Sequence, residues 1–552
     1  MSATRQTLTE NATNLADILR EQARKRPDQP AIIETHHGQP RVTTFAALER
    51  RVGQAAALLW QAGLRPGDTA LVLQPMSFEL YVALIALFRS GLTAMIVDPG
   101  AGIAQVERCC ALARPQAFIG SPRAHLLRLF APSLGRIPRR FVIGGRLTHM
   151  PGAIPWSRGE SLPPREASVP CDPDAPALLT FTSGSTGEPR AMLRSHRFLL
   201  AQYEALRRNL ASDLDGAQDG AQDSAPISMT ALPVFVLADL AAGGTSLLPP
   251  GNLRRPGEIA PAPIVAEILR YQPCRASASP AFWERVAAWC QRHEVTLPSL
   301  TAIYTGGAPV FPRLLDALRA CAPNAEVVAV YGSTEAEPIA HIARSDYLPG
   351  DGAAMRTGAG LLAGPPIADI ELRILPDRWG SPLSPYTGPA FAEASLPAGQ
   401  PGEIVVSGAH VGKGYVRGAG DAETKIDVDG AIWHRTGDAG YLDARGRLWL
   451  LGRCSARISD AHGVVYPFSV EAAASAHPAV RRSAMASWRG RRVLLVEPAY
   501  PLYDGELDVL KQSLAWAHLD AIRVVGSLPV DRRHNGKIDY PALARMLEQT
   551  GG

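Results

Sequence analysis

The pattern of apolar and polar positions first predicts a helix near the start of the chain. Within residues 15–26 the apolar side chains fall on one helical face, Asn14 is placed to cap the start, and Pro27 ends the pattern. The longest apolar run, residues 80–87, is interrupted by Arg89 and predicts a buried helix. We therefore expect an amphipathic helix and a buried helix among the first elements.

Short apolar runs rich in β-branched residues alternate with helical patterns through the first third of the sequence. The expected strands are residues 69–73, 94–97, 117–119 and 141–143, and the expected helices include residues 78–88 and 104–112. Strand–helix alternation is typical of a largely parallel sheet whose faces are covered by helices. The sequence thus predicts an α/β fold for this part of the chain.

The spacing of the apolar runs changes after residue 365. Shorter strands with Gly and Asp turns are expected at residues 370–374, 402–407, 431–434 and 448–451, which predicts a β-rich subdomain over about 366–453. The last block mixes expected strands (493–496, 522–525) with expected helices (471–476, 507–516). We expect a large N-terminal domain over residues 1–453 and a small, mobile α+β domain over residues 454–552, joined by a hinge near Arg453.

Length and composition agree with a globular protein of more than one domain. The chain has 552 residues, whereas one hydrophobic core usually serves up to roughly 250–300. Charged residues make up 20% and the net charge is +4, so nothing indicates a nucleic-acid binder. Arg136, Arg139 and Arg140 form a short run without interleaved aromatic residues, which favours a solvated surface.

The cysteines and the apolar runs bear on the cellular compartment. The seven cysteines are odd in number and form no CxxC pair, which argues against a disulfide framework and against a zinc site. The first residues lack the order of a signal peptide, and no run approaches 18 apolar residues. We therefore expect a cytoplasmic protein without a transmembrane segment.

The strongest local signal is the sequence LLTFTSGSTGEPRAMLRSH, residues 178–196. An apolar, β-prone run is followed by a loop of Ser, Thr and Gly and then by a helical pattern. Glycines let a backbone approach an anion closely, and hydroxyl and amide groups donate hydrogen bonds to phosphate oxygens. A flexible linker is the alternative, but a linker would not be confined between an apolar strand and Pro189. The loop does not match GxxxxGK[ST], so an ordinary P-loop is excluded.

This loop and five later motifs together resemble the ANL superfamily of acyl-CoA synthetases, adenylation domains and luciferases. The resemblance covers almost the whole chain. The family's phosphate-binding loop is matched with Arg190 in place of lysine and Ala191 in place of glycine, and a larger, planar guanidinium requires some adjustment there. The matching residues of the loop are Thr182, Ser183, Gly184, Ser185, Thr186, Gly187 and Arg190.

The later motifs follow in the order that the family has. The resemblance implies that one segment packs along adenine, namely Gly306, Gly307, Ala308 and Pro309. It implies that the motif Tyr331, Gly332, Ser333, Thr334 and Glu335 stacks on adenine through its tyrosine and contacts phosphate through its threonine. Glu335 would hold Mg²⁺, which prefers hard oxygen ligands.

Three further residues complete the implied site. The segment WHRTGD ends in Asp438, which by resemblance binds both ribose hydroxyls. Arg453 ends the large domain and is expected at the ribose and phosphates. Lys537, in PVDRRHNGK, corresponds to the mobile catalytic lysine. We expect Lys537, Glu335, Thr334 and Arg453 to be catalytic.

The chemistry implied is activation of a carboxylic acid by ATP and Mg²⁺, with release of pyrophosphate. A carboxylate attacks the α-phosphorus, and the metal and positioned cations stabilise the charge that develops. The segment LPVFVLADL carries Val236 where histidine often stands, and Asp239 is out of register with the aspartate that amino-acid-activating domains use. The pocket is therefore expected to be apolar and to favour a fatty acid over an amino acid.

The fate of the acyl adenylate is open at this point. The motifs look closest to the β-lactone synthetases of bacterial olefin synthesis, in which the β-hydroxyl of a fatty acid displaces AMP. In coenzyme A ligases a glycine lines the thiol tunnel, and alignment on Glu471 places His462 there. Formation of a thioester with coenzyme A or a carrier protein is the alternative. An inactive nucleotide-binding relative and a luciferase-like oxygenase are further alternatives, and the resemblance allows partner enzymes of a lipid or natural-product pathway.

Overall fold

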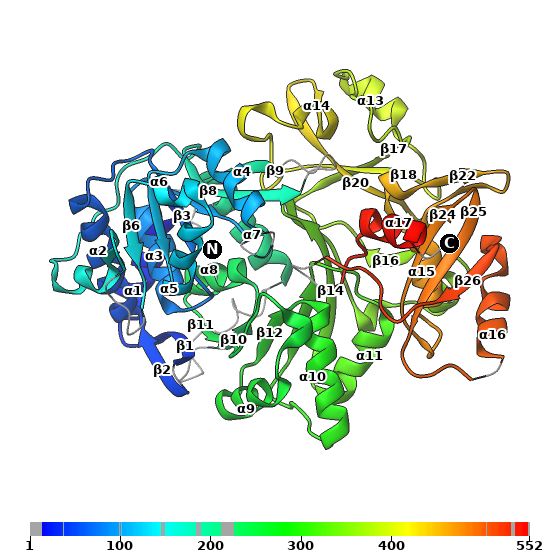
Figure 1. The fold of residues 1–552 in the computed structure, drawn as a ribbon, viewed down its shortest axis with the longest axis horizontal. Helices are drawn as coiled ribbons and strands as arrows, with labels where there is room; N and C mark the ends of the chain where they lie inside the picture. Colours follow the sequence, from blue (N-terminus) through cyan, green and yellow to red (C-terminus); the bar gives the residue numbers. More distant parts are fainter. Residues whose placement is uncertain are drawn as a thin grey trace, which may run out of the picture. The chain divides into compact units, whose positions relative to one another are not determined.

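The computed structural model describes most of the chain as two compact units. The described residues are 14–36, 38–98, 100, 102–144, 150–183, 189–210, 226–503, 505–531 and 536–549. The first unit comprises Met1–Arg254, Pro263–Ser277 and Gly414–Gly420. The second comprises Arg255–Ala262, Ala278–Lys413 and Asp421–Gly552. Figure 1 shows the ribbon with the elements labelled.

The first unit contains a seven-stranded sheet in the order β7-β6-β5-β3-β4-β8-β9, parallel except for its last pair. Its strands are β3 (Thr69–Leu73), β4 (Thr93–Ile96), β5 (Ala117–Gly120), β6 (Arg139–Val142), β7 (Ile154–Pro155), β8 (Pro176–Ser183) and β9 (Pro189–Ser195). Its helices include α1 (Leu15–Lys25), α2 (Phe45–Gln61), α3 (Phe78–Arg89), α4 (Ile103–Ala113), α5 (Pro122–Leu126) and α6 (Pro132–Arg136). The strand–helix alternation predicted from sequence is confirmed.

The helix α3 explains why the longest apolar run does not reach solvent. Every residue of α3 except Glu79 is buried, including Arg89, whose guanidinium lies 2.6 Å from the Glu49 carboxylate. The helix α1 begins where expected, with the Asn14 side chain accepting the amide hydrogen of Ala16. Because its buried charge is paired, α3 can run through the core of the unit.

Five further strands of the first unit are neighbours in the order β12-β10-β11-β1-β2 within a larger sheet. Its strands are β1 (Pro30–His36), β2 (Gln39–Thr44), β10 (Ile227–Thr230), β11 (Thr245–Leu248) and β12 (Arg275–Ala278), and the helices of this region are α7 (His196–Leu210), α8 (Pro233–Ala242) and α9 (Pro261–Tyr271). The strands β1, β10, β11 and β12 run parallel, and β2 is antiparallel to β1. The first unit is thus built from mainly parallel sheets that are covered by helices.

The second unit begins with the strands β13 (Ala302–Gly306) and β14 (Glu326–Ser333), which are parallel, and β15 (Ala336–Ala343), which is antiparallel to β14. The predicted β-rich region follows as an antiparallel sheet in the order β16-β21-β20-β18-β17, with β19 paired to β20. Its strands are β16 (Leu361–Gly364), β17 (Glu371–Leu375), β18 (Gly402–Ser407), β19 (Lys425–Val428), β20 (Ala431–Leu442) and β21 (Leu448–Arg453). Helices of this unit include α10 (Pro280–His293), α11 (Pro312–Cys321), α12 (Asp351–Arg356) and α13 (Gly388–Ala394).

The last block is built on the sheet β24-β25-β26. Its strands are β22 (Ile458–Asp460), β23 (Gly463–Val465), β24 (Val480–Trp488), β25 (Arg491–Pro498) and β26 (Ala521–Val524), and its helices are α15 (Pro467–Ala474), α16 (Glu506–Ser513) and α17 (Tyr540–Gln549). Apolar side chains cover both faces of this sheet in two clusters. The mixed α+β content expected from the sequence is confirmed.

One local expectation was wrong. A helical pattern was expected directly after the Ser/Thr/Gly loop, but β9 comes first and the helix α7 begins only at His196. The burial of residues 189–195 follows the pairing of β9 with β8, so the sheet decides the conformation of a segment whose apolar spacing is ambiguous. Among the residues that the structure describes, no helix is long and apolar enough to cross a membrane.

The buried carboxyl group of Glu471 on α15 makes stability depend on pH. Its Oε1 accepts hydrogen bonds from Tyr540 Oη at 2.8 Å and from the Met485 amide at 2.9 Å, and burial raises the pKa of Glu471 to about 7. Since the folded pKa lies above the ordinary value, the folded state binds more protons between the two values. This contribution to stability is therefore present at acidic pH and is lost as the pH rises through about 7.

We expect Glu471→Gln to remove this pH dependence, because the amide keeps an acceptor for both donors and carries no charge. Between about pH 5 and about pH 8 the wild type should lose roughly 2–3 kcal/mol of unfolding free energy through this group. Urea unfolding followed by tryptophan fluorescence would measure the difference. The exposed Asp508→Asn on α16 is the control, and equal slopes for Glu471→Gln and wild type would contradict the assignment.

Candidate active site

Two predicted nucleotide-binding segments meet at the carboxyl ends of β13 and β14. Gly306 pairs with Val330 in the parallel ladder, so the segment after Gly306 and the segment beginning at Tyr331 leave the same edge of the sheet. A Cβ on Gly306 would lie 2.6 Å from the carbonyl oxygen of Val330, which only glycine avoids. Gly307 has a φ of +83°, which turns the chain towards Ala308 and Pro309.

Asp438 of β20 joins three of the predicted residues. Its Oδ2 accepts a hydrogen bond from Tyr331 Oη at 2.8 Å, and its Oδ1 lies 3.3 Å from Arg453 Nε. Arg453 also donates to the carbonyl oxygen of Thr436 at 3.2 Å. Burial, followed by the negative charge of Asp438, raises the pKa of Tyr331 well above its usual value, so its phenol stays protonated. The carboxylate is thus held between a neutral donor and a cation.

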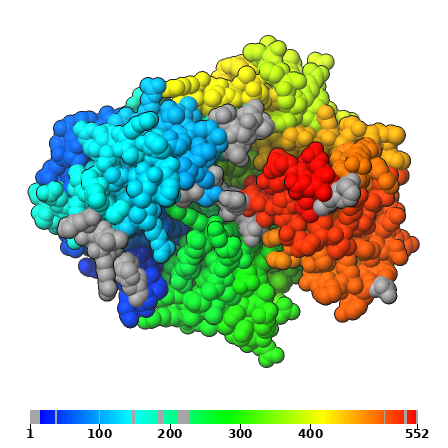
Figure 2. Space-filling view, in the orientation of Figure 1, coloured from blue at the N-terminus to red at the C-terminus, as the bar shows by residue number. Residues whose placement is uncertain are grey.

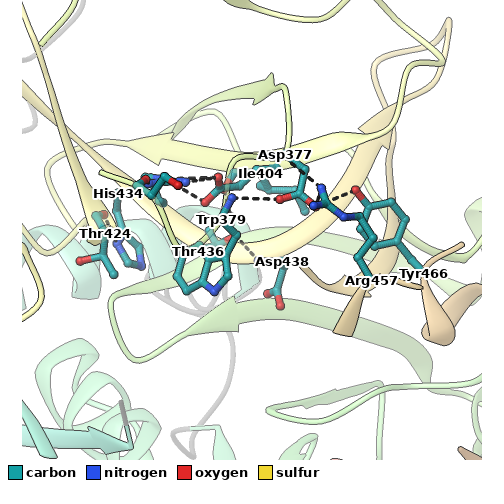
Figure 3. A network of polar contacts seen from close by, with 12 residues as sticks. Asp377, Trp379, Ile404, Thr424, His434, Thr436, Asp438, Arg457 and Tyr466 are labelled. Atoms are coloured by element: carbon teal, nitrogen blue, oxygen red, sulfur yellow. Dashed lines mark hydrogen bonds and ion pairs between the residues drawn. The ribbon is translucent and has the colours of Figure 1, made fainter. Parts of the chain in front are cut away.

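A buried ion pair supports the strand that carries Asp438. Arg435 and Glu403 are both fully buried, with Arg435 Nη2 2.7 Å from Glu403 Oε2 and Arg435 Nε 3.0 Å from Glu403 Oε1. The remaining Nη1 donates to the carbonyl oxygen of Ser381 at 2.7 Å, and the guanidinium lies over the Trp379 ring. Figure 3 shows polar contacts of this region, with Trp379, Thr436 and Asp438 labelled. The pair therefore links β20 to β18 next to the site.

Thr334 and Glu335 form the turn between β14 and β15. Glu335 is buried, its amide donates to Ser333 Oγ at 3.2 Å, and its carbonyl oxygen accepts the Gly412 amide at 2.7 Å. A Cβ on Gly332 would lie 3.0 Å from the carbonyl oxygen of Ala336 across this hairpin. The tight turn thus fixes the backbone of Glu335 through both its N–H and its C=O group.

Lys425 on β19 is a charged neighbour of Glu335 that sequence reasoning missed. Its ammonium donates to the carbonyl oxygen of Gly412 and lies 3.2 Å from His434 Nδ1. Burial lowers the pKa of Lys425 to about 8, and the carboxylate of Glu335 opposes that shift. No motif marks Lys425, and a lysine in a short strand is usually read as a solvated side chain.

His434 adds a neutral imidazole to the same cluster. Burial, followed by the charge of Lys425, lowers the pKa of His434 to about 3, so the ring is uncharged near neutral pH. Its Nδ1 lies 3.2 Å from Lys425 Nζ and 3.2 Å from the Thr424 carbonyl oxygen. A neutral ring nitrogen either accepts from the ammonium or donates to the carbonyl, so one tautomer binds Lys425 and the other binds Thr424.

The predicted phosphate loop lies in the first unit, between β8 and β9. Thr182 pairs with Arg190 and Ser183 pairs with Pro189, so the loop closes a hairpin. Gly184, Ser185, Thr186 and Gly187 lie outside the described residues. The guanidinium of Arg190 lies 5.9 Å from the centre of the Tyr415 ring, and a Cβ on Gly420 would be 2.4 Å from its Nε. A glycine at position 420 thus makes room for the arginine that replaces lysine.

The backbone of Lys537, which lies between β26 and α17, is bonded to Asp531. Its amide donates to Asp531 Oδ1 at 2.9 Å, and its carbonyl oxygen accepts the Asp531 amide at 2.8 Å. Val530 and Ile538 form a bridge on either side of these two residues. Residues 532–535 of the motif lie outside the described part of the chain. These backbone contacts of Lys537 lie within the last block.

Asp239 of α8 is engaged with the sheet beneath that helix. Its Oδ2 accepts from Ser246 Oγ at 2.9 Å, and its Oδ1 lies 3.6 Å from the Arg275 guanidinium. Burial raises the pKa of Asp239 to about 6, and Arg275 opposes that shift. Val236, one turn earlier, is fully buried in the apolar core. The only carboxylate of this segment is thus already paired within the fold.

The family model for AMP-binding enzymes matches residues 19–416. The chain is similar to the olefin beta-lactone synthetase of Xanthomonas campestris pv. campestris, with 32% identity over 97% of this chain and 98% of that protein. It is 31% identical to the olefin beta-lactone synthetase of Stenotrophomonas maltophilia over 96% of this chain and 97% of that protein. An anthranilate CoA ligase in complex with anthranoyl-AMP has the same fold, with a TM-score of 0.79, 19% identity and coverage of 98% of both chains.

The AMP-binding family model thus matches most of the chain. This chain has helix-covered sheets, a β-rich subdomain and an edge at which Tyr331 and Asp438 meet. The resemblance drawn from the motifs is confirmed, and this chain belongs to the AMP-binding enzymes of the ANL superfamily, which are AMP-forming ligases that use ATP.

Proposed function

We propose that this enzyme converts a hydrophobic β-hydroxy fatty acid into a β-lactone in two steps. In the first step a carboxylate oxygen bonds to the α-phosphorus of ATP, and the bond to the β-phosphate breaks to release pyrophosphate. In the second step the β-hydroxyl oxygen bonds to the acyl carbon, the bond to AMP breaks, and the hydroxyl proton passes to solvent or a base. Tethering of hydroxyl and acyl group gives the second step a high effective molarity.

The observation that carries this proposal is the near-full-length likeness to two olefin beta-lactone synthetases. Their identity to this chain, above 30% from end to end, is accompanied by the complete set of motif positions in one order. Fold alone would not distinguish lactone formation from other uses of an adenylate. The choice of substrate therefore rests on these relatives.

The geometry of the second unit supports the roles given to the nucleotide-binding residues. The paired carboxylate of Asp438 is suited to accept hydrogen bonds from ribose hydroxyls, and Tyr331 beside it offers an aromatic face to adenine. Arg453 would approach ribose and phosphate from the same side as Asp438. In this proposal Thr334 contacts phosphate, and Thr182 and Arg190 border the loop that cradles the remaining phosphates.

Glu335 is suited to bind Mg²⁺ as a single carboxylate ligand. In the described part of the chain no three or more His, Cys, Asp or Glu side chains are grouped so that they could hold a metal ion. Mg²⁺ usually keeps several waters and binds one or two carboxylates together with substrate phosphates. The donor set therefore fits a metal that arrives with ATP, and bound Mg²⁺ would supply Lewis-acid stabilisation of the phosphates.

Residues 454–552 are proposed to move as a small domain that brings Lys537 to the reacting phosphate. The hinge would lie near Arg453, where β21 ends. A positioned ammonium can stabilise the charge that develops on the α-phosphate. Lys537 would thus act in adenylation, while most nucleotide contacts remain on the larger part.

The acid substrate is proposed to lack an amino group near its carboxylate. Asp239 is neutralised by Arg275 and bonded to Ser246, so it is not available to bind an ammonium group. The other side chains of the helix α8 are apolar. An apolar acid is therefore favoured over an amino acid.

A thioester with coenzyme A or a carrier protein is the alternative product. His462, which aligns with the glycine of the thiol tunnel, stacks on His518 with ring centres 4.7 Å apart and planes 5° apart. Its amide also donates to Asp460, which is paired with Arg492. An imidazole held in this way supports exclusion of a pantetheine arm from that position.

We expect Glu335→Gln to reduce ATP-dependent pyrophosphate release on the order of 10²-fold, because the amide is nearly isosteric but removes the charge that anchors Mg²⁺. A pyrophosphate assay across a magnesium titration would measure this loss. Glu326→Gln is the matched control, since Glu326 begins the same strand β14 and is exposed. Wild-type turnover and an unchanged magnesium requirement in Glu335→Gln would overturn the metal role.

The product assay uses a β-hydroxy fatty acid and its analogue without the hydroxyl group, each with ATP and Mg²⁺, in the presence and in the absence of coenzyme A. We expect AMP and a β-lactone from the hydroxy acid only, detected by mass spectrometry. Lys537→Ala is the negative control and should form neither adenylate nor lactone while it still binds ATP. Efficient acyl-CoA formation from the plain acid would refute lactone formation. Absence of pyrophosphate release from every acid would refute adenylate formation itself.

A further inference from the structure

One segment of the first unit departs from the even charge balance of the chain. The whole chain has 56 Lys and Arg against 52 Asp and Glu, yet residues 108–159 contain nine arginines and no aspartate or glutamate. The preceding residue, Glu107, uses its carboxylate to accept the Ser133 amide at 3.0 Å. The elements within this segment therefore carry a positive potential with little internal compensation.

Three large apolar side chains project from the same segment. Leu126 is 52% exposed, Leu129 is 76% exposed and Phe130 is 65% exposed. Leu126 ends α5, Leu129 ends the 3₁₀ turn that follows (Leu127–Leu129), and Phe130 caps that turn. At spacings of i, i+3 and i+4 the three side chains share one face. Figure 2 shows the light-blue part of the chain, to which α5 and α6 belong, at the surface.

The opposite face of this stretch is firmly attached to the core. Ala124 and His125 are buried, and the His125 ring lies 4.5 Å from the Phe118 ring with its Nε2 3.0 Å from the Phe141 carbonyl oxygen. The exposed apolar side chains therefore belong to an ordered, anchored element. Isolated exposed apolar residues are common on soluble proteins, whereas three on one anchored face form a patch.

Arginines come from the same segment of the chain as this patch. Arg123 and Arg136 are exposed on α5 and α6. Arg128 and Arg140 are close enough that burial and the charge of Arg140 together lower the pKa of Arg128. Their guanidinium groups are held by carbonyl oxygens, at 3.1 Å from Pro151 for Arg128 and 2.9 Å from Gly135 for Arg140. Neighbouring like charges repel each other, and an anionic surface would relieve that repulsion.

We propose that residues 122–140 form a docking surface for an anionic phospholipid bilayer. Leu126, Leu129 and Phe130 enter the boundary between head groups and acyl chains, and the arginines of the same segment contact lipid phosphates. A few apolar side chains joined to a cluster of cations suffice for reversible binding at a bilayer surface. A stable protein interface needs about 800 Å² on each partner, which three side chains do not supply. This surface therefore suits a lipid partner better than a second protein.

The test is co-sedimentation of the full-length protein with vesicles of phosphatidylcholine alone and of phosphatidylcholine containing phosphatidylglycerol. We expect binding to the anionic vesicles only, and weaker binding as salt rises. The triple variant L126S/L129S/F130S should lose about tenfold or more in vesicle affinity. The double variant R123Q/R136Q should lose on the order of tenfold.

The matched control is L269S/Y503S/V509S, which removes three exposed apolar side chains at other places. It should bind vesicles as the wild type does, and all variants should release pyrophosphate from a soluble acid at the wild-type rate. Wild-type protein that does not sediment with anionic vesicles would overturn the proposal, as would equal binding by L126S/L129S/F130S. A dimer in light scattering that this triple variant abolishes would assign the patch to a second copy of the chain instead. None of these results depends on lactone formation.

Discussion

The buried pair of Arg435 and Glu403 is the interaction on which the arrangement of Asp438, Tyr331 and Arg453 in the second unit depends. Both side chains are fully buried, and every hydrogen bond of the guanidinium that the structure describes runs to Glu403 or to the Ser381 carbonyl oxygen. Loss of one partner of such a pair typically costs ~3–5 kcal/mol, because the other charge stays uncompensated in the interior. The pair thus fixes how β20 lies on β18, just before the strand reaches Asp438.

The glycine between this pair and Asp438 shows how tightly the strand is constrained. Gly437 has a φ of +69°, and a Cβ there would lie 2.8 Å from the Trp379 ring. Trp379 in turn lies against the Arg435 guanidinium. The ion pair, the indole and the glycine therefore form one packed unit, and it turns the strand so that Asp438 reaches Tyr331 and Arg453.

Much of the fold could be predicted because its buried strands and helices are continuous apolar runs of different length. The strand expected at residues 69–73 is β3, and the run predicted as a buried helix is α3. The segment after the phosphate loop was mistaken for a helix because Ala191, Met192 and Arg194 are buried at spacings that also suit a helix. The partner strand β8 decides its conformation, and pairing between distant or looped segments is not visible in local periodicity.

The site was predictable only as far as motifs mark it. Tyr331, Asp438 and Arg453 were expected from the resemblance, and the structure brings them into contact. Lys425 carries no motif, and its ammonium reaches His434 only because β19 pairs with β20 in the register Lys425 to His434. Asp239 likewise could not be assigned from sequence, since its partner Arg275 lies on a strand far along the chain. Contacts that depend on how two strands pair cannot be predicted from the sequence alone.

The segment that follows Arg453 is tied to the β-rich subdomain through one carboxylate. Asp377, which is almost fully buried, accepts from Tyr466 Oη at 2.9 Å and lies 2.9 Å from Arg457 Nη1. If the last block rotated about Arg453, Arg457 and Tyr466 would move with it, and both contacts to the Asp377 carboxylate would break unless other donors replaced them. The loss of these contacts would oppose such a rotation. The geometry at Asp377 therefore favours the orientation seen here over any orientation that separates these three side chains.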